Sequence, residues 1–291
     1  RGEPFVAIPA LARAAQRAGV AVIEECAVRT LDLTNGKITG IVTEKGRVKC
    51  SQAVLAAGAW STHFAHNAGI DLPQLAVRCT VARTEVAPKL FPGSSPIPNI
   101  QSPGLSVRRR ADGGYTLATA TYAEHYLSSK SFKYFTKFLS TLRIVRPHIR
   151  LRLGAPKGYP GAWRSERRWR GDEESPFERM RVLHPEPNAR EVTELEARVH
   201  ARFPALSGIR LEEAWAGMID VTPDVVPTLG ETAEIKGLHI CTGLSGHGFG
   251  IGPGVGRVMA DVVTGRNPGH ELTRFRPERF FDGSPIVPGP Y

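Results

Sequence analysis

A glycine-rich segment near the carboxyl end of the chain has the residue types and spacing that suit ligand binding. Within GLSGHGFGIGPGVG (243–256), every second residue from Gly246 to Gly256 is glycine, and an apolar, helix-spaced run follows. Glycine lacks a Cβ atom, so its backbone can approach a ligand closely or adopt positive φ. Free N–H groups at the start of the following helix attract negative charge. The pattern predicts a ligand-binding loop, although an ordinary glycine-rich turn has the same composition.

The helix after this loop is expected to begin at Pro253, because proline suits the first helical position. The loop contains no GxGxxG pattern, so it is not a pyrophosphate fingerprint. A planar anion lying before residues 252–255 would instead meet unpaired N–H groups. The N1–C2=O edge of a reduced flavin is such a ligand.

Two further stretches carry candidate residues. Ala57 and Gly58 end the apolar strand QAVLAAG, where open α/β sheets bind ligands, or where glycine simply ends the strand. Asp220 and Asp224 flank Pro223, either in the wall of a substrate cavity or as turn residues. Turn chemistry is favoured for Asp224, and Asp220 is left open. Tyr115 and Tyr122, on an expected strand at 113–122, either surround a substrate or belong to the core.

Composition limits the classes of partner. The 38 Lys and Arg against 28 Asp and Glu give a net charge of +10, which favours a phosphate-bearing cofactor, an acidic substrate or nucleic acid. The four cysteines form no CxxC pair, which indicates reduced thiols, no zinc motif and a cytoplasmic location. The sequence shows neither a signal peptide at its start nor an apolar run of about 18 residues that could span a membrane.

The basic segment 143–170 is the strongest indication of nucleic-acid binding. It contains nine Lys or Arg residues, with Tyr159, Trp163 and Trp169 between them. However, it fits no nucleic-acid-binding motif, and acidic residues 172–174 follow at once. A solvated face or a surface for a partner subunit is the preferred interpretation, so no nucleic acid is expected.

The expected elements divide the chain into two kinds of region. Both ends have an α/β pattern with buried strands, whereas the middle is mixed α+β with longer loops. We therefore expect residues 1–73 and 219–291 to form one domain, with 74–218 inserted as a second. The expected helices are 7–18, 130–145, 188–204 and 253–265, with a further helix starting within WSTHFAHNAG (60–69) and capped by Ser61 or Thr62. The expected strands are 20–25, 27–33, 37–43, 47–50, 52–58, 77–86, 113–122, 209–220 and 237–243.

Three motifs, in this order, resemble the D-amino acid oxidase superfamily of FAD-dependent oxidoreductases, which includes glycine oxidase and sarcosine oxidase. They are VLAAGAWS (54–61), WAGMIDVTPDVVPTLGE (215–231) and TGLSGHGFGIGPGVGR (242–257). The resemblance implies a partial FAD-binding domain of the glutathione-reductase-like Rossmann type, with an inserted mixed-sheet substrate domain. It also implies FAD as cofactor and oxidation of the C–N bond of a small amine or amino acid by hydride transfer to flavin.

The resemblance also implies site residues. His247 is expected to contact the flavin rather than act as a general base, and the backbone of Val28 either meets the adenine or belongs to a hairpin core. The implied cofactor-binding residues are Val28, Ala57, Gly58, Trp60, Ser245, Gly246, His247, Gly248, Phe249, Gly250 and Ile251. The candidate catalytic residues are His247, Asp220 and Tyr122, and no metal is expected.

Two departures from the family pattern matter. Family members begin with a strand, GxGxxG and a helix, whereas this chain opens at RGEPFVAIPALARAAQRAGV, which resembles an internal helix. The hypothesis is a fragment, or a chain whose partner supplies the missing segment; a non-catalytic subunit is the alternative. The family's carboxylate-binding arginine is replaced by Ile219, which cannot pair a carboxylate. Another basic group does so, or the substrate is an amine with its charge elsewhere.

Overall fold

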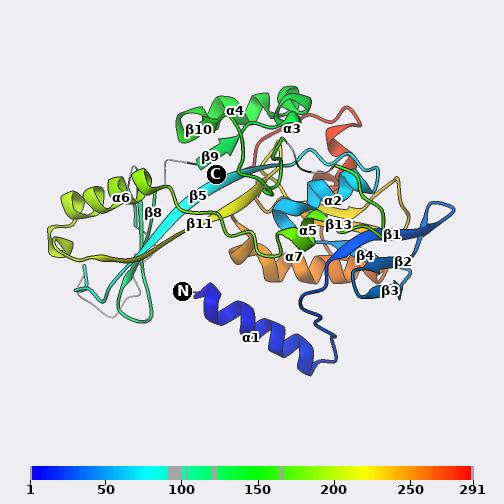
Figure 1. Cartoon of the computed structure of the whole chain (residues 1–291), viewed down its shortest axis with the longest axis horizontal. Helices are drawn as coiled ribbons and strands as arrows, with labels where there is room; N and C mark the ends of the chain where they lie inside the picture. The colour runs from blue at the N-terminus through cyan, green and yellow to red at the C-terminus, as the bar shows by residue number, and fades with distance from the viewer. Residues whose placement is uncertain are drawn as a thin grey trace.

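The computed structural model describes residues 2–90, 100–102, 104–119, 123–163, 165 and 167–289. It is elongated, and the long strands β5 (Leu75–Thr84) and β11 (Leu211–Val221) run through its middle (Figure 1). They pair antiparallel from Leu75–Val221 to Thr84–Leu211. Because β5 leads out of the amino-terminal region and β11 leads back, this pair joins the two ends of the molecule.

A large sheet surrounds this pair. Its order is β10-β9-β5-β8-β7-β6, with β11 on β5. The strand bounds are β6 Ile100–Ser102, β7 Leu105–Arg109, β8 Tyr115–Ala118, β9 Ala123–Tyr126 and β10 Ile149–Arg152. Helix α6 (Ala189–Arg202) covers the outer part and buries Leu195 and Val199 in a core with Leu117.

A smaller sheet brings the two ends of the chain together. It has the order β12-β13-β4, with β12 (Thr228–Glu231) antiparallel and β4 (Ala53–Leu55) parallel to β13 (Leu238–Thr242). Leu238 and Ile240 of the central strand β13 and Leu55 of β4 are buried in its core. Sequences almost 200 residues apart thus form one sheet.

The predicted antiparallel strands of the amino-terminal region are present. β1 (Val28–Thr34), β2 (Lys37–Thr43) and β3 (Gly46–Lys49) form a three-stranded sheet. Asn35 and Gly36 join the first two at φ values of 50° and 72°, the left-handed pair that a tight hairpin turn requires.

The remaining elements are short helices. The α-helices are α1 Pro4–Arg17, α2 Ser61–Asn67, α3 Ser129–Lys133, α4 Leu139–Val145, α5 Pro176–Arg179 and α7 Gly248–Val263, and the 3₁₀ turns are η1 Gly58–Trp60, η2 Phe135–Phe138, η3 Arg146–His148, η4 Pro204–Leu206, η5 Thr273–Phe275 and η6 Pro277–Phe280. Among the described residues, every helix is too short or too polar to cross a bilayer.

Three element predictions are wrong. Residues 20–25 form no strand, and Val20, Val22 and Ile23 are exposed, because no described strand pairs with them. The helix predicted at 130–145 is divided into α3, η2 and α4. The last helix begins at Gly248, five residues before Pro253, which lies inside it.

Candidate functional site

The glycine-rich loop is tied to the end of β11 by Asp220. The Asp220 carboxylate accepts hydrogen bonds from the Gly243 N–H (2.6 Å) and the Thr242 hydroxyl (3.0 Å). Its backbone carbonyl accepts a third from the Ser245 N–H at 3.1 Å. Ser245 and Gly246 have φ values of 51° and 86°, so the bend needs left-handed backbone. The loop is therefore held in one shape by the strand that it crosses.

Helix α7 begins as soon as this bend is complete. The carbonyl of His247 accepts hydrogen bonds from the N–H groups of Gly250 (3.0 Å) and Ile251 (3.1 Å), which makes His247 the N-cap. Among the described residues, no acceptor lies within hydrogen-bond distance of the Gly248 or Phe249 N–H groups. The positive end of the helix dipole is therefore at 248–249, not at the predicted 252–255.

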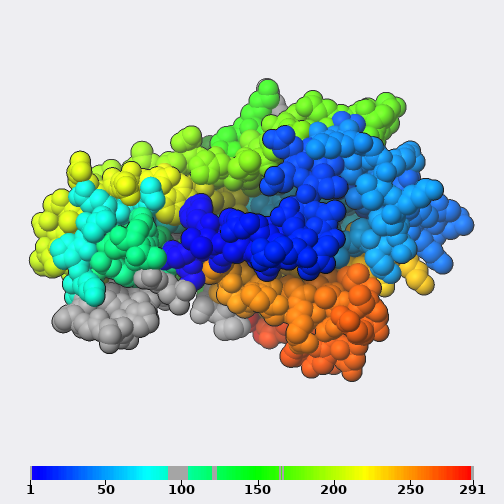
Figure 2. Space-filling model, turned by 90° about the horizontal axis from the view of Figure 1, so that it is seen from below, coloured from blue at the N-terminus to red at the C-terminus, as the bar shows by residue number. Residues whose placement is uncertain are grey.

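The first turns of α7 stand in open space. A Cβ atom added at Gly250, Gly252 or Gly254 would meet no neighbouring atom within 4 Å beyond the helix's own backbone. The side chain of Phe249 is 46% exposed. In Figure 2, α1 (dark blue) lies across this side of the molecule next to the orange surface that includes α7. A flat ligand can therefore reach this backbone without displacing side chains.

The end of β4 meets the same loop. Ala57 is exposed, and Gly58 turns the chain into η1 at a φ of 53°. The Gly58 carbonyl accepts hydrogen bonds from the buried Gln74 amide (2.7 Å) and from the Thr242 hydroxyl (3.3 Å). These bonds join two of the sequence motifs, 54–61 and 242–257, at one edge of the smaller sheet.

A large apolar cavity of about 670 Å³ opens beside the loop. Ile219 of β11, with Ser245 and His247 of the loop, lines it, as do Phe135 and Phe138 of η2. Among the described residues that line it there is no Asp, Glu, Lys or Arg. Small apolar groups fit this space, whereas an unpaired charge in it is costly.

Burial favours the neutral form of two titratable groups in the cavity. Burial lowers the pKa of His125, whose Nδ1 lies 2.9 Å from the Ala76 carbonyl and whose Nε2 lies 2.8 Å from the Ser131 hydroxyl. Burial also raises the pKa of the Cys79 thiol to about 11. At these two positions burial therefore disfavours a charge on the cavity wall.

The family described as FAD dependent oxidoreductase (DAO) matches residues 2–262. The chain belongs to the DAO family of FAD-dependent oxidoreductases. The predicted resemblance is therefore confirmed, and so is the mixed α/β fold class.

Curated relatives in this family act on amines and amino acids. The chain is similar to 4-methylaminobutanoate oxidase (formaldehyde-forming) of Paenarthrobacter nicotinovorans, 25% identical over 279 residues, covering 95% of this chain and 28% of that protein. It is also 25% identical to sarcosine oxidase subunit beta of Rhizobium meliloti (strain 1021), covering 94% of this chain and 51% of that protein. The chain thus spans about half or less of the length of these relatives.

Two solved DAO-family structures match most of the chain. L-amino acid deaminase from Proteus vulgaris superposes with a TM-score of 0.83 at 29% identity, over 96% of this chain and 63% of that chain. The enzyme from Proteus myxofaciens, solved in complex with anthranilate, gives 0.84 at 33% identity, over 94% and 59%.

The described residues fit the flavin part of FAD, the family's cofactor. The free N–H groups of Gly248 and Phe249 are the donors that an electron-rich ring edge needs. The open glycine backbone of α7 leaves room for a flat ring. For the pyrophosphate, the 291 residues contain no GxGxxG motif. The fit therefore covers the isoalloxazine end of the cofactor.

The predicted DAO-family site residues lie in different surroundings. Ser245, His247 and the loop lie at the cavity, and Asp220 lies behind the loop as its anchor. Trp60 packs edge-on against His63 and Phe177, at centroid distances of 5.9 and 5.4 Å.

The other predicted residues lie in the core or outside the described part. Val28 lies in β1 and packs against the core of the smaller sheet. Tyr115 is buried, and its hydroxyl donates to the Pro88 carbonyl at 3.0 Å. Tyr122 lies outside the described residues.

The sequence analysis missed residues that build this site. No local sequence pattern places Gln74, or Phe135 and Phe138 of η2, at this site. Their positions depend on contacts with residues distant in sequence. Arg279, which pairs with Asp224, was missed for the same reason.

Proposed function

We propose that the whole protein oxidises a C–N bond of a small amine or amino acid with FAD. The observation that carries this proposal is the meeting of two features at His247 and Ser245: the open, N–H-bearing start of α7 and the apolar cavity. When bound, FAD supplies the acceptor for the two electrons of the C–N bond. The non-catalytic subunit is the alternative.

In this proposal, the residues of the chain bind and orient the flavin and the substrate. The N–H groups of Gly248 and Phe249 hold negative charge at the ring edge, and the apolar cavity wall excludes water from the substrate. We assign flavin contact to His247 and a positioning role to Asp220, whose carboxylate is already used by the loop backbone. Tyr122 remains a catalytic candidate.

The cavity favours one class of substrate. No described cation lines it, and Ile219 stands where many family members carry arginine. A neutral amine with an apolar body therefore suits this site better than a small carboxylate-bearing substrate. Assays of the full-length protein test this ranking by comparing N-methylated alkylamines that lack a carboxylate with D-amino acids, sarcosine, dimethylglycine and L-proline, which all carry one.

The nucleotide end of FAD needs further structure. Helix α1 has no buried residue, and β4 lies at the edge of its sheet among the described strands. We propose that a segment carrying the pyrophosphate loop packs there, from this protein or a partner chain. The domain limits 1–73, 74–218 and 219–291 belong to the same proposal, although β11 runs across residue 218. The four unpaired cysteines support a cytoplasmic location.

A substitution at Gly250 tests the flavin site. In Gly250→Leu the new side chain meets open space within the protein and raises helix propensity, so the fold is retained. It occupies the space beside the free N–H groups, so flavin binding should fall by about tenfold or more. Titration of the purified variant with FAD, followed by flavin absorbance, measures this.

The matched control is Ala260→Leu, an exposed position farther along the same helix. If Gly250→Leu and Ala260→Leu bound flavin with equal affinity, the flavin would not bind at the start of α7. A full-length protein that stays colourless after FAD is added supports the non-catalytic alternative. We expect no nucleic-acid binding, and retention of the chain on DNA or RNA at low salt would contradict this expectation.

A further inference from the structure

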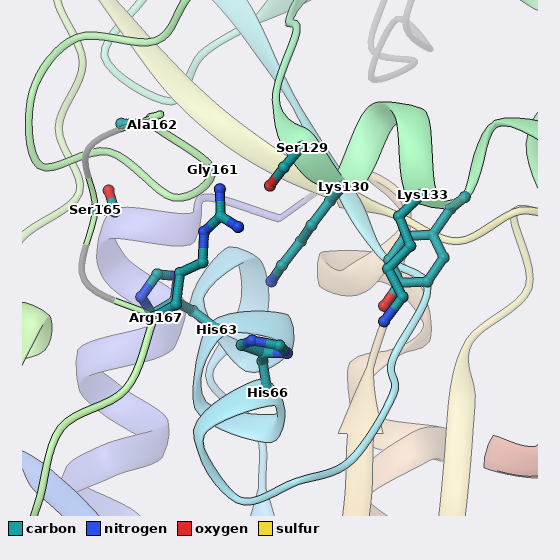
Figure 3. Close-up of a pocket in the computed structure, with 10 residues that line it drawn as sticks. His63, His66, Ser129, Lys130, Lys133, Gly161, Ala162, Ser165 and Arg167 are labelled. Carbon is teal, nitrogen blue, oxygen red and sulfur yellow. The ribbon is translucent and has the colours of Figure 1, made fainter.

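A second, smaller pocket lies between α2, α3 and the loop at 161–167. Its volume is about 210 Å³. Lys130 and Lys133 reach it from α3, His66 from α2 and Arg167 from the loop, as Figure 3 shows. Among the described residues that line it there is no carboxylate. The pocket therefore concentrates positive charge in a concave space.

Lys130 is a half-buried lysine of this pocket. Its Nζ donates to the Thr62 carbonyl and to the Thr62 hydroxyl, each at 2.9 Å. Both acceptors are neutral, so they satisfy two N–H donors without compensating the charge. A lysine ammonium has a third donor, which is left for a ligand.

The nearby carboxylate is already paired elsewhere. Asp71 forms an ion pair with Lys133 at 2.6 Å and also accepts a hydrogen bond from the Tyr134 hydroxyl. Among the described residues, no carboxylate lies within ion-pair distance of Lys130 or Arg167. Within the described part of the chain, Lys130 and Arg167 therefore have no carboxylate partner.

We propose that this pocket binds a small oxyanion through Lys130, Arg167 and His66. The hydroxyls of Ser129 and Ser165, which also line the pocket, supply further hydrogen-bond donors. The volume suits an ion of the size of phosphate or a short carboxylate. Charge-assisted hydrogen bonds from a lysine and an arginine are the usual means of holding such groups. The site is independent of FAD, so its test needs no flavin.

Binding should depend on pH. Burial, together with the nearby Lys133 and Arg167 charges and against the opposing effect of Asp71, lowers the pKa of Lys130 to about 7. Burial, Lys130 and Arg168 likewise lower the pKa of His66. An oxyanion favours the protonated forms of both groups. Affinity should therefore rise as the pH falls through the pKa of Lys130.

Sulfate is the probe for the decisive experiment, because its charge does not change near neutral pH. Calorimetric titration of the 291-residue chain with sulfate at about pH 6 and pH 8, either side of the Lys130 pKa, should give tighter binding at the lower pH. Lys130→Met and Arg167→Ala should each weaken binding by about tenfold or more. Parallel titrations with phosphate and acetate show which source of oxyanion the pocket prefers.

The matched controls are Lys49→Met and Arg170→Ala, at exposed positions outside the pocket, which should bind sulfate like the wild type. Sulfate affinity that is unchanged in Arg167→Ala and flat between the two pH values overturns the proposal, as does undetectable binding by the wild type. Because Arg167 is exposed, Arg167→Ala should fold, and it tests the proposal even if Lys130→Met does not fold.

Discussion

Asp220 and Asp224 lie on either side of Pro223 and use their carboxylates in different ways. Asp220 holds the glycine loop through the Gly243 N–H, whereas Asp224 is buried and binds Arg279 through two hydrogen bonds of 2.8 and 3.0 Å. The Val226 N–H also donates to Asp224 at 3.1 Å, which is the turn chemistry that the sequence favoured. The ion pair fixes the carboxyl-terminal segment beside β12.

Removing Arg279 should therefore destabilise the protein strongly. Arg279→Met leaves the Asp224 carboxylate buried and unpaired, which costs about 3–5 kcal/mol in the free energy of unfolding. Urea denaturation monitored by circular dichroism measures the loss. Arg17→Met, at an exposed position of α1, is the control and should change stability by less than about 0.5 kcal/mol. A similar small change in Arg279→Met would show that the pair is not buried as described.

At the scale of elements, short helices are fixed by single polar contacts. Helix α5 has only four residues, too few to be stable alone. Ser175 and Glu178 form its capping box, and the Glu178 carboxylate binds Arg29 of β1, with Nη2 and Oε1 at 2.6 Å. This contact attaches α5 to the amino-terminal sheet.

The contact should depend on pH. The hydrogen bonds from Arg29 lower the pKa of Glu178 to about 2, with help from Ser175. A lowered folded-state pKa means that the stabilisation is complete above the ordinary carboxyl pKa and is lost as the pH falls to about 2. Glu178→Gln should thus be less stable than wild type at about pH 6, with the difference shrinking on acidification.

Thermal unfolding across this pH range measures the difference between the two proteins. The control is Glu24→Gln, at an exposed position. A stability difference for Glu178→Gln that stays constant down to the lowest pH would contradict the assigned role of the carboxylate.

At the scale of the whole molecule, α1 is the exception to the burial of apolar residues. No residue of this helix is buried, and Phe5 and Leu11 are 83% and 64% exposed. Phe5 meets Trp215 edge-on, and the residues just before the helix also contact the protein: the Gly2 carbonyl accepts from Arg108 at 2.7 Å, and Glu3 binds Arg108 and the Ala111 N–H. An apolar helix in this state is typical of a surface that another segment covers.

A charge on this helix should change association but not stability. Leu11→Glu removes exposed apolar surface, so the free energy of unfolding should stay within about 0.5 kcal/mol of wild type. Self-association of the chain, measured by sedimentation velocity, should decrease. Leu153→Glu, at an exposed leucine outside α1, is the control and should leave association unchanged. A loss of stability in Leu11→Glu would show that α1 is packed in solution.

The sequence predicted those features that depend on neighbouring residues. The Asn35-Gly36 hairpin is present because both residues accept left-handed backbone, and α6 follows its apolar periodicity. The family and the fold class also followed from motifs, since glycines and short apolar strands mark where backbone approaches a ligand. Whether His247, Asp220 and the other predicted residues act in the site stays a prediction.

The tertiary structure decided what depends on distant contacts. Pro253 suggested where α7 begins, but the carbonyl of His247 caps it earlier because Asp220 bends the loop first. Residues 20–25 have the composition of a buried strand, yet they form none, because burial of a strand needs a partner that sequence composition does not specify. The basic pocket likewise exists only because folding brings α2, α3 and a loop together. The sequence shows that basic residues are present, but not that they line one pocket.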